Sequence, residues 1–234
     1  GGYILNGTKC FITNAPIADK ITLFANTREG GGIRGLTVFL VDADTKGISI
    51  GKEEDKMGIR ASATAEIIFE DCFVPDSALV GKEGRGFMIA MQTLQMSRPV
   101  VAAISVGIAQ AAIEAAVAYS HHRKQFGVKI ATFEMVQQMI ADMVMKTEAA
   151  RILTYKACVA QMNKDKKAGL YSAMSKCFAS DTAMEVTTTA VQVMGGNGYS
   201  RENPVEKYMR DAKIMQIYEG TNQIQRLVIA NEAT

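Results

Sequence analysis

The sequence predicts an α+β protein of two domains, in which a partial antiparallel β-sandwich or barrel precedes an up-down helical bundle. Residues 1–80 contain short β-rich runs that are separated by turn residues. From Gly84 onward the composition shifts to Ala, Met, Gln and Val with helical periodicity. Three long helical segments in that second part are typical of a bundle. We expect an N-terminally incomplete β-domain over 1–81 and a four-helix-bundle-like domain over 82–234.

The first part of the chain carries the strand signals. Asn6-Gly7 is a strong two-residue hairpin signal, and it is flanked by the β-rich runs Tyr3–Leu5 and Lys9–Thr13. Further strands are predicted at Ile21–Asn26, Leu36–Val41 and Thr64–Glu70. In the last of these, Ala65, Ile67 and Phe69 alternate onto one face. Pro75 and Asp76 are expected to end the sheet region.

The second part is predicted to be helical. Gly86–His122 reads as one very long helix, which Pro99 is expected to kink or interrupt. Its small residues are expected on the packing face, namely Ala102, Ala103, Gly107, Ala111, Ala112, Ala115 and Ala116. Further helices are predicted over 132–164, 168–194, 204–217 and 221–231. A glycine-rich segment, 195–198, is expected to stop the third long helix.

Bulk composition excludes several functional classes. The 234 residues are 48% hydrophobic and carry a net charge of only +2, which gives no support for nucleic-acid or membrane-surface binding. Four widely spaced cysteines predict buried free thiols in a reducing compartment. The adjacent pair His121-His122 does not suit a metal site. We expect no membrane span, because no apolar run is judged long enough. The opening Gly1–Gly7 resembles the middle of a hairpin, so a true N-terminus is expected upstream.

One carboxylate near the C-terminus is the leading catalytic candidate. Glu219 follows the apolar pair Ile217-Tyr218 and precedes Gly220 and Thr221. A carboxylate shielded from water by these neighbours and by a ligand becomes a stronger base, which could act on a weakly acidic C–H. On the decapeptide alone, an exposed Glu at a helix boundary is the favoured interpretation.

Two further motifs could bind a cofactor. Phe11 and Thr13 lie two residues apart in a strand, so an aromatic plane and a hydroxyl could face one flat heterocycle. Arg123–Gly127 follows the long helix and combines two cations, an amide and an aromatic side chain. The cations could hold a phosphate, or they could simply complement the C-terminal end of the helix.

Two further motifs, one at the end of a predicted helix and one inside a predicted helix, could bind a ligand or could have a purely structural role. The glycines of Gln192–Tyr199 let backbone N–H groups approach a phosphate, but the segment also suffices as a helix stop. It is neither a P-loop nor a Rossmann fingerprint. Arg98, in an alanine-rich helix, could anchor an anionic ligand or form an ordinary ion pair.

Taken in order, segments along nearly the whole chain resemble the acyl-CoA dehydrogenase family, most closely its medium- and short-chain members. The segments that carry the resemblance are Leu5–Lys9, Phe11–Asn14, Lys56–Ser62, Phe73–Pro75, Gly84–Phe87, Ser97–Ala103, Arg123–Gly127, Gln192–Gly198, Pro204–Lys213 and Ile217–Arg226. The family also has an all-helical N-terminal domain and a flavin- and CoA-binding segment that this sequence lacks. The resemblance therefore implies that the chain is part of a longer enzyme.

The resemblance implies an FAD-dependent enzyme that oxidises an acyl-CoA thioester to its trans-2-enoyl form. Glu219 aligns with the carboxylate that removes the α-proton while hydride leaves the β-carbon for flavin N5. Its backbone N–H, with a flavin hydroxyl, is implied to bind the thioester oxygen. Some relatives place the base at the position matched here by Ser97, which cannot hold the proton. Glu219 is therefore expected to be the sole base.

The family pattern also implies a set of binding residues. The implied FAD contacts are Phe11, Thr13, Arg123, Gln125, Phe126, Gln192, Gly195, Gly196, Thr221 and Gln223. Of these, Gln192, Gly195 and Gly196 are implied to reach the cofactor of a neighbouring subunit. The implied substrate contacts are Arg98, Tyr218 and Gly220. Two departures from relatives, Glu134 near the adenosine and Gln95 near CoA, leave those contacts undefined.

The resemblance also implies partners and leaves two alternatives open. Electrons would pass to an electron-transfer flavoprotein, and the enzyme would be a homotetramer built as a dimer of dimers. Bacterial cytoplasm and mitochondrial matrix both fit the reduced cysteines. An acyl-CoA oxidase shares the first half-reaction and is distinguished by rapid reoxidation of reduced flavin with oxygen. The piece could also be a catalytically incomplete, oligomerising helical fragment.

Overall fold

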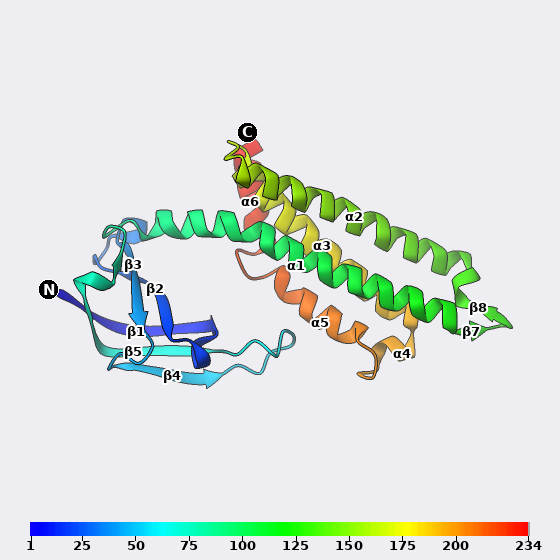
Figure 1. The fold of residues 1–234 in the computed structure, drawn as a ribbon, viewed down its shortest axis with the longest axis horizontal. Helices are drawn as coiled ribbons and strands as arrows, with labels where there is room; N and C mark the ends of the chain where they lie inside the picture. Colours follow the sequence, from blue (N-terminus) through cyan, green and yellow to red (C-terminus); the bar gives the residue numbers. More distant parts are fainter. Residues whose placement is uncertain (234) are drawn as a thin grey trace. The chain divides into compact units, whose positions relative to one another are not determined.

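The computed structural model describes residues 1–233. The chain divides into two compact units, with the boundary after Thr93. The first unit is built from six strands, drawn from blue to cyan-green in Figure 1. They are β1 (Gly2–Thr13), β2 (Lys20–Asn26), β3 (Leu36–Asp42), β4 (Ile48–Glu53), β5 (Thr64–Pro75) and β6 (Leu79–Val80). Short 3-10 helices occur at Ala15–Ile17, Gly32–Arg34 and Asp76–Ala78.

The strands form two antiparallel sheets that share one core. The sheet orders are β1-β5-β4 and β2-β3-β6. Ile67 of the first sheet and Phe39 of the second belong to one buried cluster, and the Tyr3 and Phe39 rings meet edge to face at 4.9 Å. Ala65, Ile67 and Phe69 are buried as their alternation predicts. The predicted antiparallel sandwich is therefore confirmed for this unit.

The hairpin predicted at Asn6-Gly7 is wrong. β1 runs straight through these residues as one strand beside β5, with a register shift between Leu5 and Gly7. The Asn6 side chain donates to Asp71 Oδ1 (3.2 Å) and accepts from the Asp71 N–H (2.8 Å). Asn6 thus bonds to the neighbouring strand at a β-bulge, so the pair marks a bulge and not a turn. The sheet region also extends past Pro75 into β6, and β4 was not predicted.

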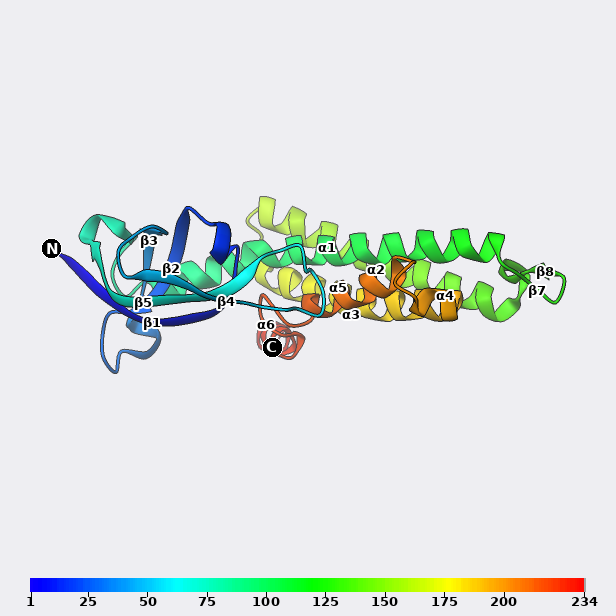
Figure 2. The ribbon, with the colours of Figure 1, turned by 90° about the horizontal axis from the view of Figure 1, so that it is seen from below.

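The second unit is helical and begins within α1 (Gly86–His122), which continues unbroken through Pro99. Helices α2 and α3 run beside α1 in Figures 1 and 2, and a small β7–β8 hairpin projects where α1 ends and α2 begins. The remaining elements are β7 (Lys124–Gln125), β8 (Val128–Lys129), a 3-10 helix (Ile130–Thr132), α2 (Glu134–Met162), α3 (Ala168–Met194), α4 (Gly196–Tyr199), α5 (Val205–Met215) and α6 (Asn222–Ala233). The helical bundle is therefore confirmed.

The bundle core is built largely from small residues. Ala112 of α1, Met143 of α2, Ala183 and Val186 of α3 and Ala212 of α5 belong to one buried cluster. α3 contacts α2, α5 and α6. Alanines let neighbouring helix backbones approach closely, so α3 can carry buried side chains along most of its length.

The packing face predicted for α1 is only partly correct. Ala102, Ala112 and Ala116 are fully buried, and Ala111 and Ala115 are half-buried. Ala103 and Gly107 are exposed. A helix turns 100° per residue, so residues directly beside a buried position rotate away from the core.

Two bulk expectations need correction. α1 contains an 18-residue window of mean hydropathy 1.9, so an apolar run of membrane-spanning length does exist. With 44% of that window buried, the run is weak evidence for a span, because core helices share this property. All four cysteines are free, but only Cys72 and Cys177 are buried; Cys10 is exposed and Cys158 is half-buried.

Candidate active site

Glu219 lies in a short turn that joins α5 to α6. Glu219 and Gly220 both adopt positive φ values, 57° and 87°. The Asn222 N–H bonds to the Gln216 carbonyl at 3.0 Å and closes the turn. Left-handed backbone at a non-glycine residue costs on the order of 1–3 kcal/mol and persists only where the surroundings fix it. The turn is therefore a strained segment that the rest of the unit holds in place.

The Glu219 side chain is half-buried and bonded to α1. Ser97 Oγ donates a hydrogen bond to Glu219 Oε2. Arg98, the next residue of α1, is 8% exposed, and its Nε has no hydrogen-bond partner. Burial lowers the pKa of Arg98, while the carboxylates of Glu219 and Glu232 oppose that shift. Arg98 thus places a partly unpaired buried cation in the field of Glu219.

The shielding expected around Glu219 is uneven. Ile217 is 49% exposed, so only about half of its surface is available to shield a neighbour from water. Tyr218 is half-buried, its hydroxyl donates to Met215 Sδ at 2.8 Å, and burial raises its pKa.

Two buried donors that the sequence analysis missed hold the backbone of the turn. Lys176 Nζ of α3 donates to the Gly220 carbonyl at 2.8 Å, and Gln225 Nε2 of α6 donates to the same oxygen at 3.0 Å. Gln225 Nε2 also lies 3.1 Å from the Glu219 carbonyl. Both side chains are fully buried. The one sequence signal was a lone lysine within the small-residue run of α3.

A cavity of about 480 Å³ brings four of the predicted cofactor residues together. Its lining includes Arg123, Gln125, Gly195 and Gly196. Gly195 has φ 59° and ψ −136°, a conformation essentially restricted to glycine. A Cβ at Gly195 or Gly196 would meet nothing within 4 Å, so the space beside them is open. A cation, an amide and accessible backbone beside open space fit an anionic dinucleotide.

Two predicted partners of that cavity do not line it. Phe126 lies in the β7–β8 turn with φ 51° and is 93% exposed. Gln192, in the last turn of α3, is exposed.

Thr221 and Gln223 line a different cavity, of about 500 Å³, next to the Glu219 turn. Asp181 and Arg226 also line it and form an ion pair at 2.6 Å. Burial disfavours the charge of Asp181, but hydrogen bonds from Arg226, Gln216 and Asn222 hold its pKa below the usual value. The cavity is therefore lined beside the turn by an ionised pair, the Asp181 carboxylate and the Arg226 guanidinium.

Phe11 and Thr13 belong to the first unit, and both are exposed near the end of β1. Phe11 has φ 56° and falls within a register shift between Lys9 and Ile12. The irregularity of β1 at this point explains why the Phe11 side chain is 71% exposed.

The chain matches two family models along almost its whole length. Residues 1–72 match the acyl-CoA dehydrogenase middle domain, and residues 84–234 match the acyl-CoA dehydrogenase C-terminal domain. A protein of Mycobacterium tuberculosis named probable acyl-CoA dehydrogenase is 51% identical over 228 residues, which cover 97% of this chain and 59% of that protein. The chain thus spans about three fifths of the length of such relatives.

Solved structures give the same result. Butyryl-CoA dehydrogenase from Megasphaera elsdenii is 48% identical with a TM-score of 0.97, over 99% of this chain and 60% of that one. A structure reported with the electron transferring flavoprotein of Acidaminococcus fermentans and flavin-based electron bifurcation is 52% identical with a TM-score of 0.96, over 99% and 61%. PigA with FAD and proline is 34% identical with a TM-score of 0.95, over 100% and 61%. The chain belongs to the acyl-CoA dehydrogenase family.

Proposed function

We propose that the chain forms the middle and C-terminal domains of an FAD-dependent acyl-CoA dehydrogenase, with a domain boundary near Gly81. The observation that carries this proposal is the Glu219 turn. The strained backbone of this turn is held by two buried donors and presents one carboxylate, that of Glu219. Ser97 donates a hydrogen bond to this carboxylate, and the charge of Arg98 interacts with it. Such a carboxylate is restrained at one oxygen and can accept a proton at the other.

In this proposal Glu219 removes the α-proton of the thioester. FAD, when bound, supplies the acceptor for the β-hydride. Ser97 sits where some relatives carry their base, and its hydroxyl donates to Glu219 instead. That contact supports a single carboxylate base. The Glu219 N–H would bind the thioester oxygen and stabilise the enolate-like charge, while Arg98, Tyr218 and Gly220 would line the substrate side.

The two cavities support the FAD assignment. Arg123, Gln125, Gly195 and Gly196 would hold the pyrophosphate and adenosine part, with the exposed Phe126 and Gln192 beside them. Thr221 and Gln223 would contact FAD beside the base. In the first unit, Phe11 and Thr13 would face the isoalloxazine. Of these residues, Gln192, Gly195 and Gly196 would reach the cofactor of a neighbouring subunit.

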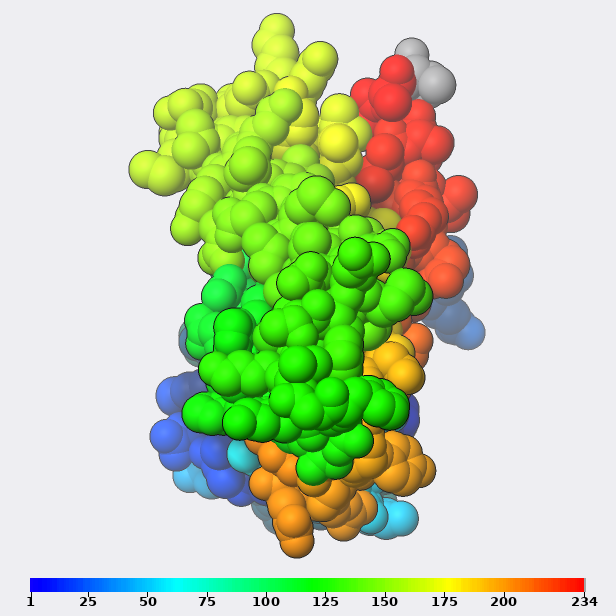
Figure 3. Space-filling model, turned by 90° about the vertical axis from the view of Figure 1, so that its right-hand side faces the viewer, coloured from blue at the N-terminus to red at the C-terminus, as the bar shows by residue number. Residues whose placement is uncertain are grey.

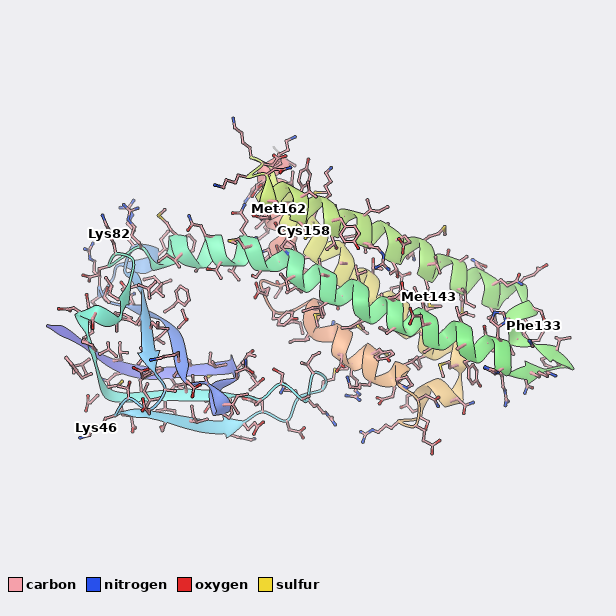
Figure 4. All side chains as sticks on the ribbon, viewed as in Figure 1. Lys46, Lys82, Phe133, Met143, Cys158 and Met162 are labelled. Atoms are coloured by element: carbon pink, nitrogen blue, oxygen red, sulfur yellow. The ribbon has the colours of Figure 1, made fainter. Side chains whose placement is uncertain are left out.

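An exposed apolar face on α2 supports a homotetramer built as a dimer of dimers. The large apolar side chains on it are Val144, Met145, Ile152, Tyr155, Val159 and Met162, each more than 40% exposed. Figure 3 shows α2 in green to yellow-green at the surface of the bundle, and Figure 4 labels Met162 near the end of this helix. Exposed apolar patches of this extent mark protein interfaces.

An electron-transfer flavoprotein is the proposed electron acceptor. The structure related to the Acidaminococcus fermentans flavoprotein supports this choice over an oxidase. The named relatives are bacterial, which favours bacterial cytoplasm over mitochondrial matrix.

The test is Glu219→Gln in the full-length enzyme. Gln is nearly isosteric but accepts no proton, so we expect acyl-CoA to bind while anaerobic bleaching of the flavin falls by at least about 1000-fold. Glu185→Gln, which removes a surface carboxylate paired with Lys146, is the matched control and should bleach normally. Unchanged bleaching in Glu219→Gln would contradict the base assignment. Fast reoxidation of the reduced wild type by oxygen would indicate the oxidase instead.

A further inference from the structure

A fully buried lysine lies in the N-terminal third of α3. Lys176 is 0% exposed, although lysine is among the residues least often buried without a partner. Its Nζ donates to the Gly220 carbonyl at 2.8 Å and to Asn222 Oδ1 at 2.9 Å. Removing an ammonium from water is costly, so these two contacts must be strong enough to hold it there.

Gln225 approaches the same turn from α6. Its Nε2 is within 3.1 Å of the Glu219 carbonyl and within 3.0 Å of the Gly220 carbonyl. A Cβ on Gly220 would lie only 2.6 Å from this nitrogen. The amide is therefore packed directly onto the glycine, and two consecutive carbonyls of the turn are bonded by fully buried side chains.

We propose that Lys176 and Gln225 are positioning residues for Glu219, which fix its carboxylate by clamping the two carbonyls of the left-handed turn. The inference rests on the proposed function, because it gives a role to groups that act through the base. Positive φ at Glu219 needs an external restraint, because only glycine adopts it freely, and these two donors bond to the carbonyls of Glu219 and of the adjoining Gly220. A base displaced by about 1 Å loses on the order of 100-fold in rate.

The charge of Lys176 acts on the same site. Burial lowers its pKa to about 8, which still leaves the cation predominant at neutral pH. The ionisable groups in its field are Arg98 of α1, Cys177 and Asp181 of α3, and Glu219 of the turn, while Arg226 of α6 pairs with Asp181. A cation in the field of a carboxylate favours its ionised form.

A purely structural role, in which Lys176 only joins α3 to α6, makes a different prediction. Ser180 offers the matched comparison, because its Oγ bonds to the Asn222 side chain at 3.2 Å and 2.8 Å without touching either carbonyl of the turn. Ser180→Ala weakens the α3–α6 junction and leaves the clamp in place.

The test uses the full-length, FAD-loaded enzyme, with butyryl-CoA as the first probe and longer acyl-CoAs as further ones. We expect Lys176→Met to slow anaerobic flavin reduction by about 100-fold, with the acyl-CoA dissociation constant changed by less than about threefold. The acidic limb of its pH–rate profile should move to higher pH, because the carboxylate loses a neighbouring cation. Gln225→Met should slow the reaction without moving that limb. Ser180→Ala and the exposed-lysine control Lys156→Met should match the wild type.

Wild-type rates and an unchanged pH profile in folded Lys176→Met would overturn the inference. So would a rate loss that Ser180→Ala reproduces. If Lys176→Met does not fold, the test is made with Gln225→Met and Lys176→Gln. Wild-type rates in both of these variants would reject the proposed positioning role. A wild-type enzyme that no acyl-CoA reduces would reject the proposed function itself, which is a separate result.

Discussion

Two glycine-containing turns of the second unit are built in opposite ways. At the end of α3, a Cβ on Gly195 or Gly196 would meet nothing within 4 Å. Between α5 and α6, a Cβ on Gly220 would lie 2.6 Å from a buried amide nitrogen. The first turn keeps its backbone open to the outside, whereas the second is closed by the protein's own side chains.

The difference shows what each glycine is for. An open glycine beside Arg123 and Gln125 leaves room for a ligand to reach the backbone. A closed glycine lets Lys176 and Gln225 reach the backbone instead. Under the proposed function, the same residue type serves cofactor binding at the end of α3 and rigidity beside the proposed base.

The largest effect is expected for Gly220→Ala. Its φ of 87° disfavours alanine, and the added Cβ would collide with Gln225 Nε2. We expect a loss of about 2–3 kcal/mol in stability and at least about a 100-fold slower flavin reduction. Thermal unfolding and anaerobic stopped-flow absorbance of the full-length enzyme measure the two effects.

Gly30→Ala separates the two causes. Gly30 has φ 67° but open space around its Cβ position, so alanine there meets only the backbone strain. If Gly220→Ala and Gly30→Ala lose equal stability, and both keep wild-type rates, the second turn is not clamped and the comparison fails.

A second effect, which depends on pH, is expected from Lys176. Its pKa in the folded protein is about 8, below the ordinary 10.5. Between those values the unfolded chain binds more protons, so the stability contributed by Lys176 rises with pH. Relative to Lys176→Met, wild type should gain up to about 3 kcal/mol as pH rises from about 8 to about 10.5.

Urea unfolding at several pH values measures this gain, with Lys156→Met as the exposed-lysine control. Parallel stability curves for wild type and Lys176→Met would mean that Lys176 is not held in a desolvated site.

The helices could be predicted from the sequence far better than the strands. α1 and α3 begin and end at the expected residues, because alanine-rich periodicity and a glycine stop are local signals. The prediction of a hairpin at Asn6-Gly7 was wrong because the Asn6 side chain bonds to Asp71, which lies 65 residues away on β5. A local turn signal cannot register a strand that pairs from such a distance.

The proposed site shows the same division. Glu219 and Gly220 stood out because a carboxylate followed by glycine is visible in the sequence itself. Lys176 acts on a carbonyl 44 residues away, and every residue has a carbonyl, so no side-chain motif identifies its acceptor. Positioning donors of this kind become visible only once the backbone is folded.

The smallest effect on stability, and the sharpest contrast with Gly220, is expected for Gly196→Ala. Gly196 opens α4, its φ is not in the left-handed region, and its Cβ position is free, so stability should change by less than about 0.5 kcal/mol. The methyl group would nevertheless project into the space beside Arg123 and Gln125 that we assign to the dinucleotide. We therefore expect at least about tenfold weaker FAD binding, measured by fluorescence titration of the apoenzyme.

Gly107→Ala, at an equally open position on α1, should leave FAD binding unchanged and stabilise its helix by up to about 1 kcal/mol. Unchanged FAD affinity in Gly196→Ala would show that the open turn serves only to end α3, and the contrast between the two glycines would then reduce to one of packing.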